Sequence, residues 1–199
     1  MWKKIEFAIV LLLLAVLIMM SNHLEEMVSS GRVTGRNPCI VLDSGHGGED
    51  PGKIGVNQAK EKDVMLGDPA AGNKKIRDMK ARVERINKTM PQAAVSIHQN
   101  SYQDAQIHGA QVFYYSHSEE GKRMAEVMQK ALLKADEENT RQAKANDTYY
   151  LLKRTEVPTI IVECGFLSNP EEAAKLVSPK YQEKLAEAIA EGILACMEN

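Results

Sequence analysis

The 199-residue chain lacks several features that would assign it to a common class of protein. Its 25 lysines and arginines are balanced by 27 aspartates and glutamates, so it has no basic excess and we expect no nucleic-acid partner. Its cysteines are three, an odd number, and two of them lie in apolar runs, which indicates buried thiols rather than a disulfide framework. Repeats and low-complexity segments are absent as well. With 44% hydrophobic and 26% charged residues, the composition is that of an ordinary globular protein and excludes a disordered one.

The longest hydrophobic run lies near the N-terminus, where fourteen consecutive apolar residues, 7–20, follow Lys3 and Lys4. This layout is typical of an export signal, and the run is shorter than the roughly twenty residues of a membrane-spanning helix. No small-x-small cleavage site follows it, so an uncleaved anchor is the alternative. A buried helix is disfavoured because nothing would cover its apolar surface on every side. We expect a signal peptide or membrane anchor at 1–22, a linker at 23–37 and one domain at 38–199, exported or membrane-anchored and extracytoplasmic.

Apolar strands alternate with amphipathic helices along residues 38–199. Short apolar runs predict strands at 39–42, 93–97, 109–115 and 158–162, each bounded by glycine, proline or polar residues. Apolar residues at three- and four-residue spacing predict a helix at 73–88, and helix-start signals lie at Ser116, Asn169 and Ser178. Strands that are apolar throughout are typical of a sheet covered on both faces. The prediction is an α/β fold: a three-layer, mostly parallel sheet with helices on both faces, preceded by the hydrophobic segment.

Three of the predicted strands end in a residue able to bind a metal or carry a proton: His46, His98 and Glu163. In open α/β sheets, sites collect at the carboxyl ends of the strands. Glu61 opens the segment after the glycine-rich turn and is a fourth candidate. Two imidazoles and one carboxylate complete the three-ligand set of a hydrolytic zinc, and a further carboxylate can then move the proton of a water.

Each of these residues also has a simpler interpretation. A histidine beside glycine at a strand end is commonly a turn residue bonded to the backbone, and tight turns need glycine for positive φ. A phosphate-binding loop is a further alternative, but GHGG at 45–48 fits neither of the common glycine-rich phosphate motifs. The sequence also has no compact HExxH metal motif. Spacing alone therefore leaves the choice open.

Three segments resemble the signature blocks of a known family. They read VLDSGHGG at 41–48, SIHQN at 96–100 and VECGFLSN at 162–169. In this order they are similar to the blocks of the zinc-dependent N-acetylmuramoyl-L-alanine amidases, and the resemblance runs from about Pro38 to the C-terminus. The wording SIHQNSY at 96–102 and RQAKAND at 141–147 is most similar to the germination-specific branch in spore-forming bacteria, which is also made with an N-terminal hydrophobic segment.

The resemblance implies a site, a reaction and partners. The family's zinc ligands fall on His46, Glu61 and His98, and its catalytic glutamate falls on Glu163. The implied reaction hydrolyses the amide between N-acetylmuramic acid and L-alanine of the peptidoglycan stem peptide, with Zn²⁺ as cofactor. In the sporulation branch this precedes muramic-δ-lactam formation in the spore cortex. Residues 38–199 would be the catalytic domain, with a sporulation protein as a possible partner.

The chain is short for this family after Glu61. Members follow this glutamate with a helix, a second strand and a long loop, which need about 25 residues or more by ordinary element lengths. Here only the eleven residues 62–72 are available, and GDPAAG at 67–72 is rich in turn residues. We therefore expect one helix cut to about a turn and one sheet strand missing, which leaves an unpaired strand edge.

Other residues near the blocks have two interpretations each. Cys164 could be a nucleophile, but its position on a buried strand, alternating away from Glu163, favours a core thiol. Tyr149 and Tyr150 could line a sugar or peptide groove or pack in the core. Asn100 could orient the ligand loop, and Arg141 could bind a stem-peptide carboxylate or lie in an exposed loop.

Three functions compete on the sequence alone. The first is an active zinc amidase. The second is a peptidoglycan-binding or regulatory relic that lost turnover through the deletion, although binding alone would not require Glu163. The third is another zinc hydrolase of the same polymer, such as a carboxypeptidase or a deacetylase. The product distinguishes them: new N-terminal alanine for an amidase, free acetate for a deacetylase.

Overall fold

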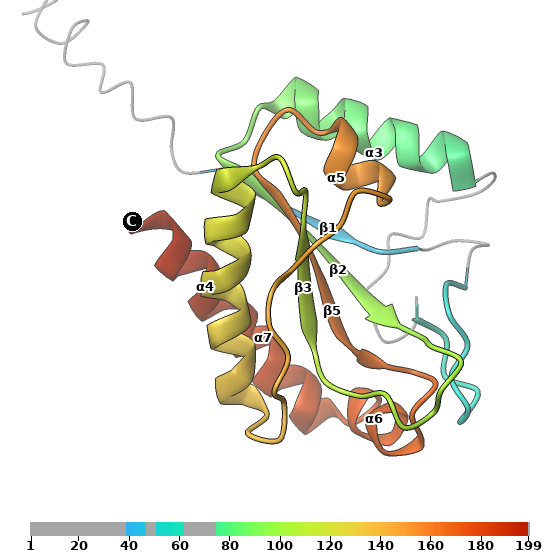
Figure 1. Cartoon of the computed structure of the whole chain (residues 1–199). Helices are drawn as coiled ribbons and strands as arrows, with labels where there is room; N and C mark the ends of the chain where they lie inside the picture. The colour runs from blue at the N-terminus through green and yellow to red at the C-terminus, as the bar shows by residue number, and fades with distance from the viewer. Residues whose placement is uncertain (1–38, 47–50, 62–74, 199) are drawn as a thin grey trace, which may run out of the picture. The chain divides into compact units, whose positions relative to one another are not determined.

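The computed structural model describes residues 39–46, 51–61 and 75–198, all within the compact unit Cys39–Asn199. The predicted signal or anchor at 1–22 and the linker at 23–37 lie outside the described residues. Along the chain the elements are β1 (Ile40–Ser44), α3 (Lys75–Thr89), β2 (Ala93–Asn100), β3 (Gln111–Tyr114), α4 (Glu119–Ala135), β4 (Lys144–Ala145), α5 (Tyr150–Arg154), β5 (Thr159–Phe166), α6 (Pro170–Leu176) and α7 (Pro179–Met197) (Figure 1).

The strands form one five-stranded sheet in the order β1-β2-β5-β3-β4. The pairs β1–β2, β2–β5 and β3–β4 are parallel, while β3 runs antiparallel to β5. The predicted mostly parallel α/β sheet is therefore confirmed, with one reversed strand that the apolar pattern did not reveal. Two of the predicted strands are longer than expected, since β2 continues through His98 and β5 through Glu163, while β3 is shorter than the predicted 109–115.

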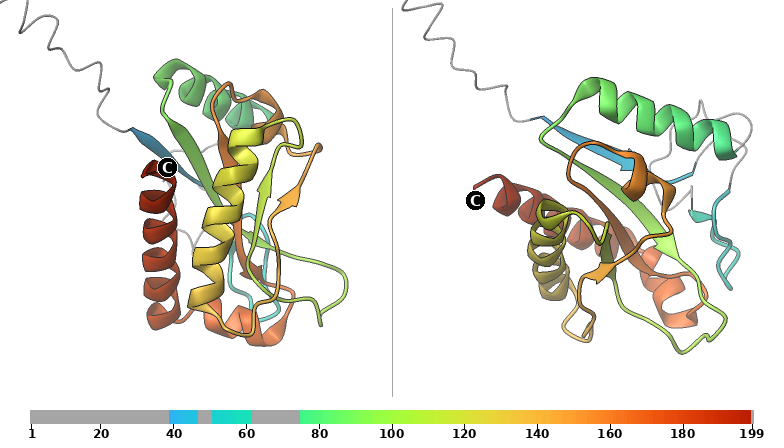
Figure 2. Two further views of the ribbon diagram at one scale, coloured as in Figure 1. Left: turned by 60° about the vertical axis from the view of Figure 1, so that its left-hand side comes forward. Right: turned by 45° about the horizontal axis from the view of Figure 1, so that its top comes forward.

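Helices cover both faces of the sheet, as the three-layer prediction requires (Figure 2). On one face lie α4 and α7, which pack on each other and on the larger core cluster. On the other face lie α3 and α5, over a smaller cluster. The helical spacing explains this packing, because α4 turns Met124, Met128 and Leu132 inward from one stripe.

The start of α4 corrects one prediction. Ser116 was expected to cap this helix, but the cap is Ser118, whose hydroxyl accepts from Gly121 N at 3.0 Å. Ser116 instead donates to the carboxylate of Asp147. An N-cap accepts from the N–H two or three residues further on. Ser116 has a glutamate three residues on whereas Ser118 has Gly121, so the capping-box pattern favoured the serine that does not cap the helix. Asn169 caps α6 as expected.

The strand edge expected from the shortened segment is present. Among the described residues, no sheet strand lies between β1 and α3, and β1 pairs with β2 only. Leu42 in β1 is 60% exposed, which is unusual for the middle of a strand in an α/β sheet. The truncated helix expected after Glu61 would lie in 62–74, outside the described residues.

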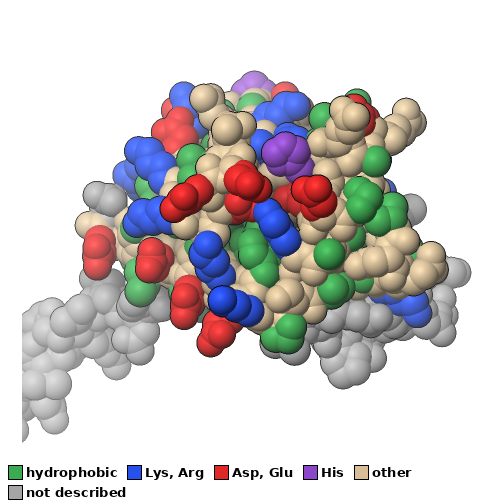
Figure 3. Space-filling model, turned by 90° about the horizontal axis from the view of Figure 1, so that it is seen from below, with side chains coloured by type: hydrophobic (Ala, Val, Ile, Leu, Met, Phe, Trp, Pro, Cys, Tyr) green, Lys and Arg blue, Asp and Glu red, His purple; other side chains and the backbone are tan. Residues whose placement is uncertain are grey.

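No helix within 39–46, 51–61 and 75–198 is both long and apolar enough to cross a bilayer. On the face seen in Figure 3, acidic and basic side chains lie next to one another. This mixture agrees with the formal net charge of −2.

Candidate metal centre and active site

The register of three neighbouring strands brings the predicted site residues together. Asp43 of β1 is the partner of Ser96 in β2, and His98 of β2 is the partner of Glu163 in β5. Because strand side chains alternate between faces, all four point to the face covered by α3 and α5. They lie at the carboxyl ends of parallel strands, where the sequence predicted the site.

His46 follows β1 in a tight turn. The N–H of Gly45 donates to Ile97 O at 2.8 Å, which extends the β1–β2 ladder by one residue before the chain turns away. His46 itself has φ of 64°, a conformation that a non-glycine residue adopts only when its surroundings hold it. Its carbonyl accepts from Arg82 Nη2 of α3 at 3.1 Å. The turn thus aims the imidazole back over the end of the sheet.

Glycine is required at position 45 because the ring of His98 lies against it. A Cβ atom added there would overlap the imidazole, and the ring could not yield without moving away from Glu61. We expect Gly45→Ala to lower zinc affinity by about 100-fold or more, since displacing a ligand costs at least as much as losing its supporting contacts. Isothermal titration would measure this. Gly192→Ala in α7, whose Cβ would meet only the flexible Met128 side chain, is the control and should bind zinc like the wild type.

Glu61 is carried by a short hairpin that precedes the shortened segment. Lys53 and Glu61 are joined twice, by Glu61 N to Lys53 O at 2.8 Å and by Lys53 N to the Glu61 carboxylate at 2.9 Å. The hairpin is fastened to the region of α6 through Val56 N to Leu167 O and Asn57 Nδ2 to Ala173 O. Glu61 is 1% exposed. Among the described residues, its position is therefore fixed by the hairpin and by the contacts of the hairpin with Leu167 and Ala173.

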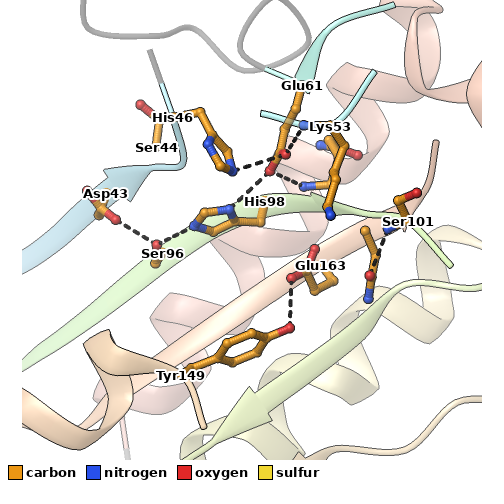
Figure 4. A network of polar contacts seen from close by, with 12 residues as sticks. Asp43, Ser44, His46, Lys53, Glu61, Ser96, His98, Ser101, Tyr149 and Glu163 are labelled. Atoms are coloured by element: carbon orange, nitrogen blue, oxygen red, sulfur yellow. Dashed lines mark hydrogen bonds and ion pairs between the residues drawn. The ribbon is translucent and has the colours of Figure 1, made fainter. Parts of the chain in front are cut away.

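His46, Glu61 and His98 form one compact cluster (Figure 4). Glu61 bridges the two rings: one oxygen lies 3.1 Å from His46 Nε2 and the other 3.0 Å from His98 Nδ1. One ligand atom from each of the three lies within 4.8 Å of the others. With bond lengths of about 2.0–2.1 Å, two ligands of a tetrahedral zinc lie about 3.3 Å apart, so this donor set fits the ion.

The carboxylate of Glu61 is strongly stabilised in its charged form. Burial alone would raise the pKa of Glu61, but hydrogen bonds with His46, His98 and the backbone N–H groups of Gln99 and Lys53 hold this pKa well below its usual range. A metal ligand has to be deprotonated, and Glu61 meets this condition at neutral pH.

Glu163 lies beside this cluster in a different environment. It is 6% exposed, and its Oε2 has no hydrogen-bond partner among the described residues. Its Oε1 accepts from the Tyr149 hydroxyl at 3.4 Å. Burial raises the pKa of Glu163 to about 7, against smaller opposing effects of His98 and Tyr149. A buried carboxylate with an open oxygen is suited to exchanging a proton with a bound molecule.

The raised pKa of Glu163 predicts a pH dependence of stability for the metal-free protein. The folded state holds a proton on this group up to about pH 7, whereas the unfolded chain loses it near pH 4.5. Folding stability therefore falls as pH rises from about 4.5 to 7, by about 2–3 kcal/mol. Glu163→Gln removes this loss, so we expect the variant to be more stable than the wild type at pH 8 and similar at pH 4.5.

Urea unfolding of the chelator-treated proteins at both pH values would measure this difference. Glu187→Gln changes an exposed glutamate of α7 and is the control, expected to match the wild type at both. An advantage of Glu163→Gln that is the same at the two pH values would contradict the titration of Glu163 as its cause.

The structure also places the residues that had two interpretations. Tyr149 and Tyr150 line a cavity of about 110 Å³ at the site, which agrees with the first of their two interpretations, and Tyr149 contacts Glu163. Cys164 is 3% exposed in the core, as expected. Arg141 is half-buried, because its guanidinium stacks on Phe166, 4.7 Å from the ring centre. It does not line the cavity either. 

Asn100 was considered as a residue that orients the ligand loop. Its side-chain oxygen accepts from the N–H of Ser101 at 2.8 Å, so it braces the turn after β2. The side chain that contacts His98 from within its own strand is Ser96, at 3.1 Å from Nε2. Ser96 lies in the second signature block, SIHQN at 96–100. Nothing in its spacing distinguishes a hydroxyl that contacts His98 from one that packs in the core.

Comparison with known proteins now decides the family. The family model described as N-acetylmuramoyl-L-alanine amidase matches residues 68–195, which include His98 and Glu163. The chain belongs to the N-acetylmuramoyl-L-alanine amidase family. The sequence-based prediction of an amidase is therefore confirmed. The matched range begins after His46 and Glu61. What connects these two residues to His98 is the pair of contacts that Glu61 makes with the two imidazoles.

One curated relative is the germination-specific N-acetylmuramoyl-L-alanine amidase of Bacillus subtilis (strain 168), 35% identical over 185 aligned positions that cover 78% of each chain. Since 78% of this chain is about 155 residues, about 30 of those positions have no counterpart in it. This agrees with the expected internal deletion.

Two solved amidase structures share the fold and most of the chain's length. The CwlD amidase of Clostridioides difficile, in complex with the GerS lipoprotein, superposes with a TM-score of 0.75 at 32% identity, over 81% of this chain and 99% of that one. An N-acetylmuramoyl-L-alanine amidase of Nostoc punctiforme has a TM-score of 0.71 at 30% identity, over 80% and 97%. The alignment therefore extends over nearly the full length of both solved amidases, although this amidase has a shortened segment after Glu61.

Proposed function

We propose that this amidase is a zinc enzyme that hydrolyses the amide between N-acetylmuramic acid and L-alanine in peptidoglycan, with His46, Glu61 and His98 as metal ligands and Glu163 as the catalytic acid–base. One observation supports this most directly: the three ligand side chains converge within 4.8 Å at the sheet edge, and Glu163 is paired in register beside them. A relic that only bound peptidoglycan would have no need of a buried carboxylate next to a metal site.

The ligand set determines what a bound ion would contribute. Two neutral histidines and one carboxylate would leave Zn²⁺ with a net charge of +1, enough to polarise a carbonyl and to bring the pKa of a water to about 7. Three protein ligands leave the fourth tetrahedral position open for water or substrate, as in hydrolytic sites rather than structural ones.

Glu163 carries the proton transfers of the reaction. Its open Oε2 accepts a proton from the attacking water as the water oxygen bonds to the lactyl carbonyl carbon. Glu163 then returns this proton to the alanine nitrogen as the carbon–nitrogen bond breaks, so the products are a lactyl carboxylate and a stem peptide with a free amine. The Tyr149 hydroxyl holds the other oxygen and so orients the carboxylate for both transfers.

The cavity at the site limits how the substrate binds. At about 110 Å³ it is small beside the roughly 300–1,000 Å³ of ordinary ligand pockets. The reacting amide therefore enters the cavity while the glycan and the rest of the stem peptide lie outside it. Tyr150, 39% exposed at the rim, is placed to contact those outer parts.

The product of the purified full chain on peptidoglycan tests this function. Reconstituted with one equivalent of zinc, the protein is expected to release peptides with N-terminal L-alanine and to leave the glycan strands intact. Release of acetate would indicate a deacetylase, and release of free C-terminal amino acids a carboxypeptidase. Stoichiometric zinc without any product would indicate the relic.

We further propose the spore cortex as the place of action, with muramic-δ-lactam formation as the downstream outcome. The names of the relatives support this: one is a germination-specific amidase, and another was solved with a lipoprotein bound. By the same argument a sporulation lipoprotein is the proposed partner. Deletion of the gene should leave a cortex without muramic-δ-lactam, measured by chromatography of digested spore peptidoglycan.

The N-terminal organisation remains part of this proposal. Residues 1–22 would export or anchor the protein, 23–37 would link, and 38–199 would form the catalytic domain in the extracytoplasmic space. Cell fractionation and the intact mass of the mature protein would distinguish a cleaved signal from an anchor: the former releases a chain shortened by about twenty residues, as expected for a signal peptide.

A further inference from the structure

A chain of polar contacts runs from α3 through the sheet to the ring of His98. Arg82 Nη1 donates to Asp43 Oδ1 at 2.7 Å. The Ser96 hydroxyl lies 2.6 Å from Asp43 Oδ2, and His98 Nε2 lies 3.1 Å from the Ser96 oxygen (Figure 4). Ser96 is fully buried, and Arg82 and Asp43 are each 14% exposed. The chain reaches the ring nitrogen opposite the one that faces Glu61.

The direction of each hydrogen bond follows from what the groups can do. A guanidinium only donates, so the Asp43 carboxylate is an acceptor toward Arg82. An ionised carboxylate has no proton to give, so the hydroxyl of Ser96 must donate to Asp43. The Ser96 oxygen then presents a lone pair to His98, and Nε2 of that ring has to be the N–H donor. In the neutral ring that would bind a metal, Nδ1 of His98 therefore carries the lone pair, and the metal takes the place of the proton that Nδ1 shares with Glu61 in the metal-free protein.

The same guanidinium also holds the turn that carries the other histidine. Besides Asp43, Arg82 donates to Ser44 O at 2.6 Å and to His46 O at 3.1 Å, and its Nε pairs with Asp78 on its own helix. A simple brace between helix and sheet would need the ion pair with Asp43 alone. Arg82 instead divides its donors. Some hold the backbone of Ser44 and His46, and one holds the Asp43 side chain, which leads through Ser96 to His98.

We propose that Arg82, Asp43 and Ser96 are positioning residues of the metal site: Asp43 and Ser96 fix the tautomer and orientation of His98, and Arg82 fixes Asp43 together with the backbone of His46. This rests on the proposed zinc site. Groups that orient metal-bound histidines in this way commonly contribute about 10- to 100-fold in metal affinity. Sequence spacing did not single out any of the three.

The test measures the zinc dissociation constant of full-length variants by chelator competition, with the melting temperature of each metal-free protein as the second readout. We expect Ser96→Ala to bind zinc about 10- to 100-fold more weakly than the wild type. The control is Ser118→Ala, which removes the cap of α4 and should lower the melting temperature while binding zinc like the wild type. A merely structural role for Ser96 would give the control's result instead.

Asp43→Asn provides a second, sharper variant. Because Arg82 only donates, the asparagine carbonyl must turn to Arg82 and its NH₂ group to Ser96. The Ser96 hydroxyl is then released to donate to Nε2 of His98, which moves the ring proton to Nδ1 and blocks the metal-binding lone pair. We therefore expect Asp43→Asn to weaken zinc binding at least as much as Ser96→Ala.

The double variant shows whether the two residues act in one chain. Without the Ser96 hydroxyl there is no proton to redirect, so Ser96→Ala/Asp43→Asn should bind zinc like Ser96→Ala alone. Losses that multiply in the double variant, or single variants that bind within about twofold of the wild type, would overturn the proposal while leaving the amidase function standing. A wild-type protein that binds no zinc would overturn both.

Discussion

Replacing Glu163 by glutamine is expected to lower the turnover rate on peptidoglycan by about 10³- to 10⁴-fold while zinc stays bound at one equivalent. General acid–base groups commonly contribute about 10²- to 10⁴-fold, and Glu163 serves twice, once toward water and once toward the leaving nitrogen. The substitution keeps the size and polarity of the side chain, and Glu163 has no hydrogen bond to a metal ligand in the contacts described. Initial rates of peptide release and the zinc content of the same samples measure both halves of the prediction.

Tyr149→Phe gives the graded comparison for this experiment. It removes a single hydroxyl that donates to Glu163 over 3.4 Å, so we expect turnover to fall by no more than about tenfold. The assignment of Glu163 as acid–base would be wrong if Glu163→Gln kept more than about a tenth of wild-type turnover, or if Tyr149→Phe were the more damaging of the two.

The second large effect is expected at Glu61. Structural zinc sites with four ligands bind with about 10–16 kcal/mol, so removing one ligand costs about 3 kcal/mol, or 10²- to 10³-fold in affinity. Glu61→Gln keeps the shape but loses the charge, and its NH₂ group would point a donor at one of the two imidazoles. We therefore expect weak zinc binding and loss of activity, measured by competition titration and by peptide release.

Glu172→Gln is a matched control for this substitution. Glu172 is also buried, and its two oxygens likewise accept from backbone N–H groups, of Gly109 and Phe166, at 2.9 and 2.8 Å. Among the described residues it has no hydrogen bond to His46 or His98, so the variant should lose stability but keep its zinc affinity. Equal zinc affinities for Glu61→Gln and the wild type would show that this glutamate is not a ligand.

Much of the fold followed from the sequence because its signals are local. Apolar runs and capping residues gave the strands and most helices, including the start of α6 at Asn169. The reversed direction of β3 did not follow, because a strand buried on both faces has the same apolar pattern in either direction. The short elements β4 and α5 were also missed, since two and five residues are too few to show a period.

For the proposed site, the sequence supplied the candidate residues, and the structure supplied their relations. The strand-end positions of His46, His98 and Glu163 suggested one edge, Glu61 after the glycine-rich turn was the fourth candidate, and the family resemblance implied the role of each. What could not be foreseen was how Glu61 is held, since the hairpin that carries it is stabilised by backbone contacts with Leu167 and Ala173, more than a hundred residues away. The role of Ser96 depended on the register of β1 against β2, which no single strand specifies.

The hydrogen bonds that hold Glu61 determine which substitutions are tolerated at position 53. Two of the four hydrogen-bond donors to Glu61 are main-chain N–H groups, those of Lys53 and Gln99. Every amino acid except proline supplies such a group, so the exposed position 53 is free to change its side chain over evolutionary time while the carboxylate stays fixed. A saturation library at this position should tolerate nearly every replacement and reject proline, a pattern opposite to that expected of a residue that acts through its side chain.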